Sequence, residues 1–217
     1  MTPEHKKSSF AALTLAAVGI VYGDIGTSPL YTLKAVFDTT HCLALTTPNL
    51  LGVLSLIFWA LTIIVSLKYV TLVLRADNRG EGGVMALMAL ALNSVTKHSG
   101  WYVPLMMLGV FGATMFYGDS VITPAISVLG AIEGIAVAAP GTEAWVVPIS
   151  VVVLVALYSV QSRGTAGIGR WFGPIMVVWF LTLAVMGVYH IFEAPEVLAA
   201  LNPMHAGRFM LENKFTA

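Results

Sequence analysis

The stretch FAALTLAAVGIVYGDIGTSPLYTLKAVF (residues 10–37) decides how the chain must fold. It is apolar at both ends and about long enough for a helix to cross a bilayer. In its middle lies GDIGTSP (residues 23–29), where two glycines and a proline disfavour helical hydrogen bonding. The stretch therefore predicts a transmembrane helix that is broken at Gly23, Gly26 and Pro29.

The composition of the whole chain also indicates a membrane protein. Of its 217 residues, 58% are hydrophobic and 10% are charged, whereas soluble domains have roughly 25% charged residues. This excludes a soluble globule, a disordered chain and a collagen-like repeat. Eleven basic and eleven acidic residues give zero net charge, so no nucleic acid is expected as a partner. The single Cys42 excludes a disulfide framework.

The apolar segments predict an all-α integral membrane protein with five transmembrane helices. The predicted spans are residues 10–37, 50–74, 102–139, 145–160 and 171–192. The third is too long for an upright span and too short for two, so we expect one long, tilted helix. The apolar piece at residues 84–92 is too short to span and predicts a surface or re-entrant helix.

Basic residues mark alternate loops and so predict the orientation. They precede the first span and lie between spans two and three and between spans four and five: Lys6, Lys7, Arg75, Arg79, Lys97, Arg163 and Arg170. By the positive-inside rule, residues 1–9 are cytoplasmic, residues 10–193 form the five-helix region and residues 194–217 are extracytoplasmic. A cleavable signal peptide at the N-terminus is an alternative, which the further spans disfavour.

The break in the first span predicts a cation site. Unwound backbone in a membrane is tolerated where it lines a cavity or is buried in protein, and interrupted spans point to transporter binding sites. Asp24 supplies a carboxylate there, and freed backbone carbonyls are further expected ligands. Tyr31 follows Asp24 by seven residues, so its hydroxyl is expected on the same side. The alternative is a kinked helix in which Asp24 pairs with a polar neighbour.

The third span carries a polar stripe at Asp119, Thr123 and Ser127, spaced four residues apart. A carboxylate with hydroxyls on one stripe can replace the water shell of an ion or carry a proton. For Thr123 and Ser127, interhelical hydrogen bonding is an equal alternative, whereas an intramembrane carboxylate is usually functional. Glu133 lies about 21 Å further along the helix, either as a vestibule residue that attracts cations or at a solvated helix end.

Five ordered motifs resemble the Kup/HAK/KT family of potassium uptake transporters. They are YGDIGTSPLY (22–31), RGEGGVMAL (79–87), FYGDSVITPAISV (116–128), QSRG (161–164) and LNPM (201–204). The resemblance covers essentially the whole chain. It implies the amino acid–polyamine–organocation (APC, LeuT-like) fold of two inverted five-helix repeats, and uptake of potassium coupled to protons. The chain resembles the first repeat only, so a sixth span and the C-terminal repeat are expected to be missing.

The resemblance also implies roles for individual residues. The ion site comprises Asp24, Tyr31, Asp119, Thr123 and Ser127, with potassium at Asp24 and Asp119. Asp119 is the expected proton carrier and Asp24 the second candidate, because burial favours the protonated acid and a nearby potassium ion favours the carboxylate. Potassium and protons are transported species, and no resident cofactor is expected. The expected partners are membrane lipid, the missing repeat and a second copy in a homodimer, in the bacterial inner membrane.

Two alternatives to a potassium–proton symporter stay open at this point. An amino-acid carrier of the same fold is disfavoured because Asp24 repels a substrate carboxylate at the unwound helix. A non-transporting fragment or assembly subunit is the second alternative, and a reading frame that continues downstream distinguishes it. An enzyme is not expected, because the sequence shows no nucleophile–base pair.

The charge alternation makes the orientation testable by cysteine labelling in a Cys42→Ser background. A membrane-impermeant maleimide added to intact cells is expected to label a cysteine at Thr142 and to leave cysteines at Arg79 and Arg163 unlabelled. Permeabilised cells, in which all three positions react, provide the control. Labelling of position 79 or 163 from outside overturns the five-span map.

Overall fold

The computed structural model describes residues 9–20, 22–37, 43–161 and 165–213, with residues 20, 161 and 165–171 described by their backbone alone. Within these ranges every regular element is a helix, and one isolated bridge joins Asn78 to Glu81. The predictions that concern Lys6, Lys7, Cys42 and Arg163 lie outside the described residues.

Four helices of the described chain are long and apolar enough to cross a membrane. They are Thr47–Arg75, Tyr102–Ala138, Glu143–Val160 and Phe172–Glu193. A fifth crossing results if Phe10–Gly19 and Tyr22–Val36, whose axes differ by 48°, form one bent span. The prediction of an all-helical chain with several membrane-capable helices is confirmed.

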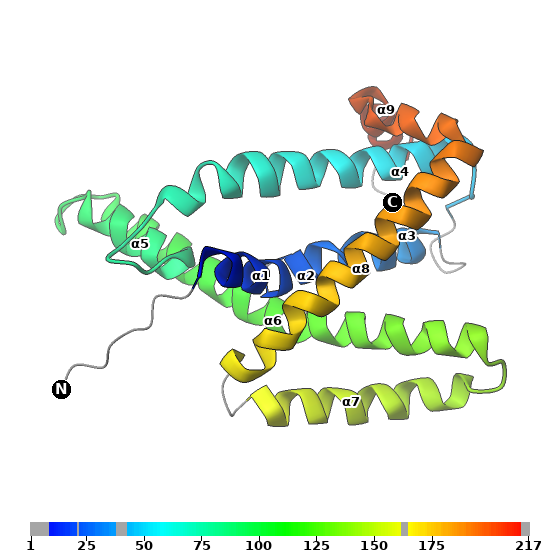
Figure 1. Ribbon diagram of the computed structural model, residues 1–217. Helices are drawn as coiled ribbons and strands as arrows, with labels where there is room; N and C mark the ends of the chain where they lie inside the picture. Colours follow the sequence, from blue (N-terminus) through cyan, green and yellow to red (C-terminus); the bar gives the residue numbers. More distant parts are fainter. Residues whose placement is uncertain (1–8, 21, 38–42, 162–164, 214–217) are drawn as a thin grey trace. The chain divides into compact units, whose positions relative to one another are not determined.

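The chain divides into two compact units, and the first contains residues 1–49, 126–199 and 213–217. In this unit the first span consists of α1 (Phe10–Ile20), α2 (Tyr22–Ile25) and α3 (Ser28–Val36). It also contains the end of α6 (Tyr102–Ala138), a short 3-10 turn (Glu143–Trp145), α7 (Val146–Gln161) and α8 (Thr165–Glu193). Helix α8 packs along α1 (Figure 1).

Two glycines bring the backbones of α1 and α8 into direct contact. A Cβ atom added to Gly19 would lie 2.7 Å from the carbonyl carbon of Phe172, and one added to Gly173 would lie 2.5 Å from the carbonyl oxygen of Leu15. Such distances leave no room for any side chain at either position. Small residues at a crossing are typical of membrane helices, because they allow close van der Waals packing where the hydrophobic effect contributes little.

Helix α8 begins earlier than the sequence predicted. The predicted span starts at residue 171, whereas α8 is helical from Thr165. Each glycine costs a helix only about 1 kcal/mol relative to alanine, so Gly167 and Gly169 do not prevent a long apolar helix from starting there. The membrane-capable part of this helix is Phe172–Glu193.

The second unit contains residues 50–125 and 200–212. It comprises most of α4 (Thr47–Ala60), a π-helical segment (Leu61–Val70), a 3-10 turn (Val73–Arg75), α5 (Gly83–Asn93), the first part of α6 and α9 (Pro203–Asn213). A further 3-10 segment, Pro195–Leu201, leads into α9. The short apolar α5 corresponds to the surface or re-entrant helix predicted at residues 84–92.

Helix α9 is anchored on α4. Phe209 is buried against Gly52, where an added Cβ atom would lie 2.6 Å from the Cβ atom of Phe209. The buried Ser55 hydroxyl donates to the carbonyl of Asn202 at 3.0 Å, and Trp59 Nε1 donates to the carbonyl of Leu201 at 3.1 Å. Helix α9 and the two residues that precede it, Leu201 and Asn202, therefore pack on α4 within the second unit.

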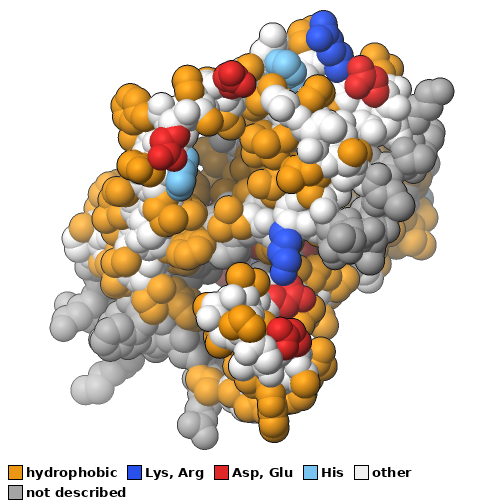
Figure 2. All heavy atoms as spheres, turned by 90° about the vertical axis from the view of Figure 1, so that its right-hand side faces the viewer, with side chains coloured by type: hydrophobic (Ala, Val, Ile, Leu, Met, Phe, Trp, Pro, Cys, Tyr) orange, Lys and Arg blue, Asp and Glu red, His pale blue; other side chains and the backbone are white. Residues whose placement is uncertain are grey.

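Hydrophobic side chains dominate the face shown in Figure 2, and charged side chains on it are few. Helix α6 has no buried residue along its whole length, and at most 17% of the most apolar window of any membrane-capable helix is buried. A water-facing surface of this kind is unfavourable, so these side chains require lipid or further protein around them.

The contact between α1 and α8 makes a stability prediction. Gly19→Ala places a methyl group against the backbone of Gly173, which cannot move as a side chain can, and is expected to destabilise the protein by about 1–3 kcal/mol. Gly187→Ala, in α8 with nothing within 4 Å of its added Cβ atom, is the matched control and is expected to be neutral. Thermal unfolding in detergent micelles measures both, and equal melting temperatures for the two variants contradict the prediction.

Candidate functional site

A turn at Gly26 and Thr27 separates α2 from α3, whereas the 48° bend of the first span lies between Phe10–Gly19 and Tyr22–Val36. Gly23 lies inside α2, and Pro29 lies in the first turn of α3. N–H groups in the first turn of a helix have no partner within the helix, so the absence of an N–H group on proline costs nothing there. The interruption is therefore shorter than the seven-residue break that the sequence suggested. Asp24 lies before the turn, and Tyr31 lies after it.

The prediction that this turn frees carbonyl groups is wrong for five of them, because each has a hydrogen-bond donor. They are the carbonyls of Tyr22, Gly23, Asp24, Gly26 and Thr27. The Thr27 hydroxyl lies 3.3 Å from the Gly23 carbonyl oxygen and 3.2 Å from that of Asp24, so it serves the end of α2. Local polar groups thus replace the helical bonds that the turn removes.

The carbonyl of Gly26 is held by a residue far away in sequence. Trp179 Nε1, on α8, donates to this oxygen at 3.1 Å. Gly26 is buried, and a Cβ atom added to it would lie 2.8 Å from the ring of Phe180. Sequence reasoning missed Trp179, because 153 residues separate the two partners and no local pattern connects them. Helix α8 therefore contacts both α1 and the turn, and holds the turn through Trp179.

Three side chains form a hydrogen-bonded chain across the turn. The Tyr31 hydroxyl donates to Ser28 Oγ at 2.8 Å, and Ser28 Oγ donates to Asp24 Oδ1 at 2.8 Å. An ionised carboxylate accepts hydrogen bonds only, so its charge sets the direction of both bonds. Asp24 is exposed, whereas Ser28 and Tyr31 are half-buried. Tyr31 and Asp24 were expected on the same side of the span, and Ser28 connects them there through its hydroxyl. Ser28 was not among the predicted site residues, although it lies at a helical spacing from both.

The second carboxylate, Asp119, lies on α6. Thr123 Oγ1 donates to Asp119 Oδ1 at 2.7 Å, so these two members of the predicted stripe are in contact. Ser127 is half-buried one helical turn further along. Asp119 is exposed, so the expected burial in an apolar wall is not present in this part of the chain. Asp24 and Asp119 belong to different compact units, and each group is described by itself.

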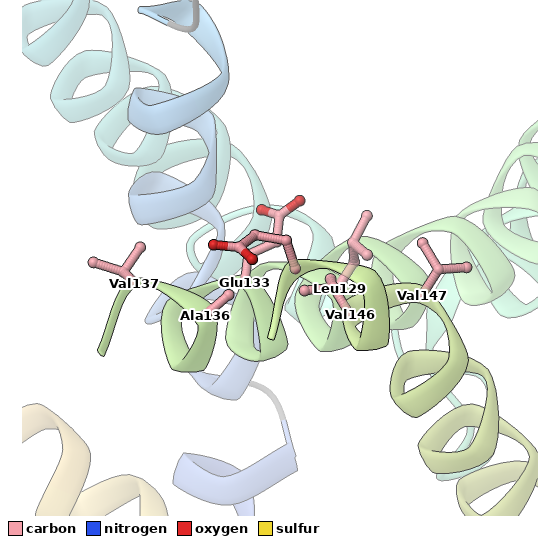
Figure 3. A pocket seen from close by; sticks show the side chains of 7 residues that line it. Leu129, Glu133, Ala136, Val137, Val146 and Val147 are labelled. Carbon is pink, nitrogen blue, oxygen red and sulfur yellow. The ribbon is translucent and has the colours of Figure 1, made fainter. Parts of the chain in front are cut away.

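Glu133 forms an ion pair with Lys34 of α3 at 2.5 Å. It also lines an open groove of about 550 Å³ between α6 and the start of α7, together with apolar residues and Glu143 (Figure 3). The other lining residues are Leu129, Ala136, Val137, Val146 and Val147. Glu133 is therefore neither free nor simply solvated, and its ion pair ties α3 to the end of α6.

Comparison with known proteins identifies the family. The model of the K+ potassium transporter integral membrane domain matches residues 11–217. The chain belongs to the potassium transporter family. A Janthinobacterium protein and a Herminiimonas arsenicoxydans protein, both named "Probable potassium transport system protein Kup", are 72% and 70% identical to it over all 217 residues. A protein of the same name from Nitrosospira multiformis is 55% identical over 98% of the chain.

The chain spans about a third of the length of these relatives, 35% for the first two and 34% for the third. No solved structure matches the chain. The family is one of transporters, and nothing in these comparisons points to catalysis.

The hydrogen bond at the turn makes a further stability prediction. Trp179→Phe keeps an aromatic ring but removes the donor, so the buried Gly26 carbonyl loses its partner at a cost of about 1–3 kcal/mol. Trp145→Phe, at a side chain that is 63% exposed, is the control and is expected to change stability by less than about 0.5 kcal/mol. If both variants lower the thermal unfolding temperature equally, the Trp179 bond contributes nothing specific.

Proposed function

We propose that this chain is the N-terminal part of a potassium–proton symporter that takes up potassium across the bacterial inner membrane. Its membership of the potassium transporter family and the printed names of its relatives support the substrate. Its membrane-capable helices support a multi-pass location. The observation that carries the proposal furthest is the Tyr31–Ser28–Asp24 chain, because it presents oxygen ligands at a helix break.

The chemistry of these groups suits a potassium ion. Hydroxyl and carboxylate oxygens can replace the hydration shell of such an ion, as oxygen ligands do in selectivity filters. The Tyr31 hydroxyl hydrogen points to Ser28 Oγ and the Ser28 hydrogen points to Asp24 Oδ1, so lone pairs of Tyr31 Oη and the second carboxylate oxygen are available to a cation. We propose that Asp24, Tyr31, Asp119, Thr123 and Ser127 bind the ion during its passage.

Asp119 is the proposed proton carrier. Its carboxylate can take up and release a proton, and it bonds to Thr123, another proposed ligand of the ion. In a symporter the proton and the potassium ion cross in the same loaded state, so the carrier has to hold its proton while potassium is bound nearby. Asp24 is the second candidate, because it carries the other carboxylate of the proposed site.

The proposed architecture is the first repeat of an APC-type transporter, with the N-terminus in the cytoplasm. The bent first span agrees with this proposal, since discontinuous helices form the substrate sites of such transporters. Alternating access requires one repeat or bundle to move against another, so transport is expected to need the part of the protein that corresponds to the rest of the relatives' length.

The function is tested in a chimera in which this chain replaces the matching N-terminal part of the Janthinobacterium relative. Asp119→Asn keeps the oxygen that Thr123 bonds but cannot carry a proton, so potassium uptake should lose its dependence on the proton gradient or stop. Asp24→Asn should raise the potassium concentration for half-maximal uptake at least roughly ten-fold, because it removes charge from the site. Proton flux driven by potassium in proteoliposomes measures both effects.

Milder variants and a control complete this test. Thr123→Val and Ser127→Ala remove neutral ligands and are expected to weaken uptake about five-fold each, since a neutral hydrogen-bonding group contributes about 1 kcal/mol. Glu196→Gln neutralises an exposed carboxylate outside the proposed site and should leave uptake unchanged. A membrane-inserted chimera that moves no potassium contradicts the proposed function, and proton-coupled uptake by Asp119→Asn places the proton carrier elsewhere.

A further inference from the structure

Ser28 is not one of the proposed ion ligands, yet it bonds to two of them. It is the first residue of α3, directly after the turn, and its hydroxyl lies between the Asp24 carboxylate and the Tyr31 hydroxyl. It accepts the hydrogen of one and donates its own to the other, at 2.8 Å in both cases. Removal of this one oxygen atom therefore disconnects Asp24 from Tyr31.

We infer that Ser28 is a positioning residue, which holds the Asp24 carboxylate and the Tyr31 hydroxyl in the arrangement that binds potassium. This inference rests on the proposed function of Asp24. The exposed Asp24 side chain has several rotamers open to it, and the bond from Ser28 selects one. The bond from Tyr31 likewise turns the phenolic hydrogen toward Ser28 and leaves the phenolic lone pairs for a cation.

The turn explains why such a residue is needed. Asp24 lies in α2 and Tyr31 in α3, and the turn at Gly26 and Thr27 separates these two helices. Ser28 Oγ bonds to the side chains on both sides of this turn, at the i, i+4 and i, i+3 spacings of a helix. Thr27, the other hydroxyl residue of the turn, bonds to backbone carbonyls, so it does not substitute for Ser28. The Thr27 hydroxyl thus bonds to the backbone, whereas the Ser28 hydroxyl bonds to side chains.

The inference predicts a change in potassium affinity. In the chimera described above, Ser28→Ala is expected to raise the potassium concentration for half-maximal uptake roughly ten-fold, the cost of one hydrogen bond to a charged group, with little change in maximal rate. Ser28→Thr keeps the hydroxyl and is expected to restore affinity to near the parent value. Thr182→Val is the matched control, because Thr182 Oγ1 bonds only the carbonyl of Val178 in its own helix, at 2.9 Å.

A double-variant cycle tests the connection to Tyr31. Tyr31→Phe and Ser28→Ala interrupt the same chain of bonds, so the double variant is expected to lose less affinity than the product of the two single losses. Additive losses overturn the connection. A well-folded Ser28→Ala chimera with the parent affinity, or Ser28→Thr as impaired as Ser28→Ala, overturns the positioning role. If Asp24→Asn also keeps the parent affinity, the proposed function of Asp24 fails instead.

Discussion

In a bilayer, every backbone N–H and C=O group must find a partner within the protein, and the first span breaks the regular pattern that supplies those partners. The turn at Gly26 and Thr27 is possible because other groups replace the missing helical bonds. The Thr27 hydroxyl serves carbonyls before the turn, and Trp179 Nε1 serves Gly26 itself. Helix α8, which packs on α1, therefore also supports the turn that carries the carboxylate and hydroxyls of the proposed site.

Glycine governs the packing in both compact units. In the first, Gly19 and Gly173 let α1 and α8 touch by their backbones. In the second, Gly52 accommodates Phe209 of α9, while Gly109 of α6 accommodates the side chain of Met88 on α5. With few buried large side chains among the described residues, these contacts carry much of the packing that a hydrophobic core supplies in a soluble protein.

Local patterns predicted much of this molecule, and two of the misses concern partners that lie far apart in the sequence. Apolar length indicated the helices, and the glycines and proline of residues 23–29 indicated the break. The four-residue spacing also predicted that Asp119 and Thr123 lie side by side on one helix face. The bond to the Gly26 carbonyl was missed because its donor, Trp179, is supplied only by the tertiary structure. The ion pair of Lys34 with Glu133 was missed for the same reason, since 99 residues separate the two side chains. Four other carbonyls at the turn bond to local groups.

The first span is held at two places, one on each side of its turn. Before α3, Gly19 and Gly26 are fixed on α8, and in α3 itself Lys34 is fixed to Glu133 of α6. Between these attachments lies the turn at Gly26 and Thr27, and the Ser28–Asp24 bond closes across it. A change in the angle between α2 and α3 would therefore alter the length of that bond. Under the proposed function, a cation that attracts Asp24 and Tyr31 from the two sides of the turn would act on this angle, so ion binding and backbone geometry would be coupled at this point.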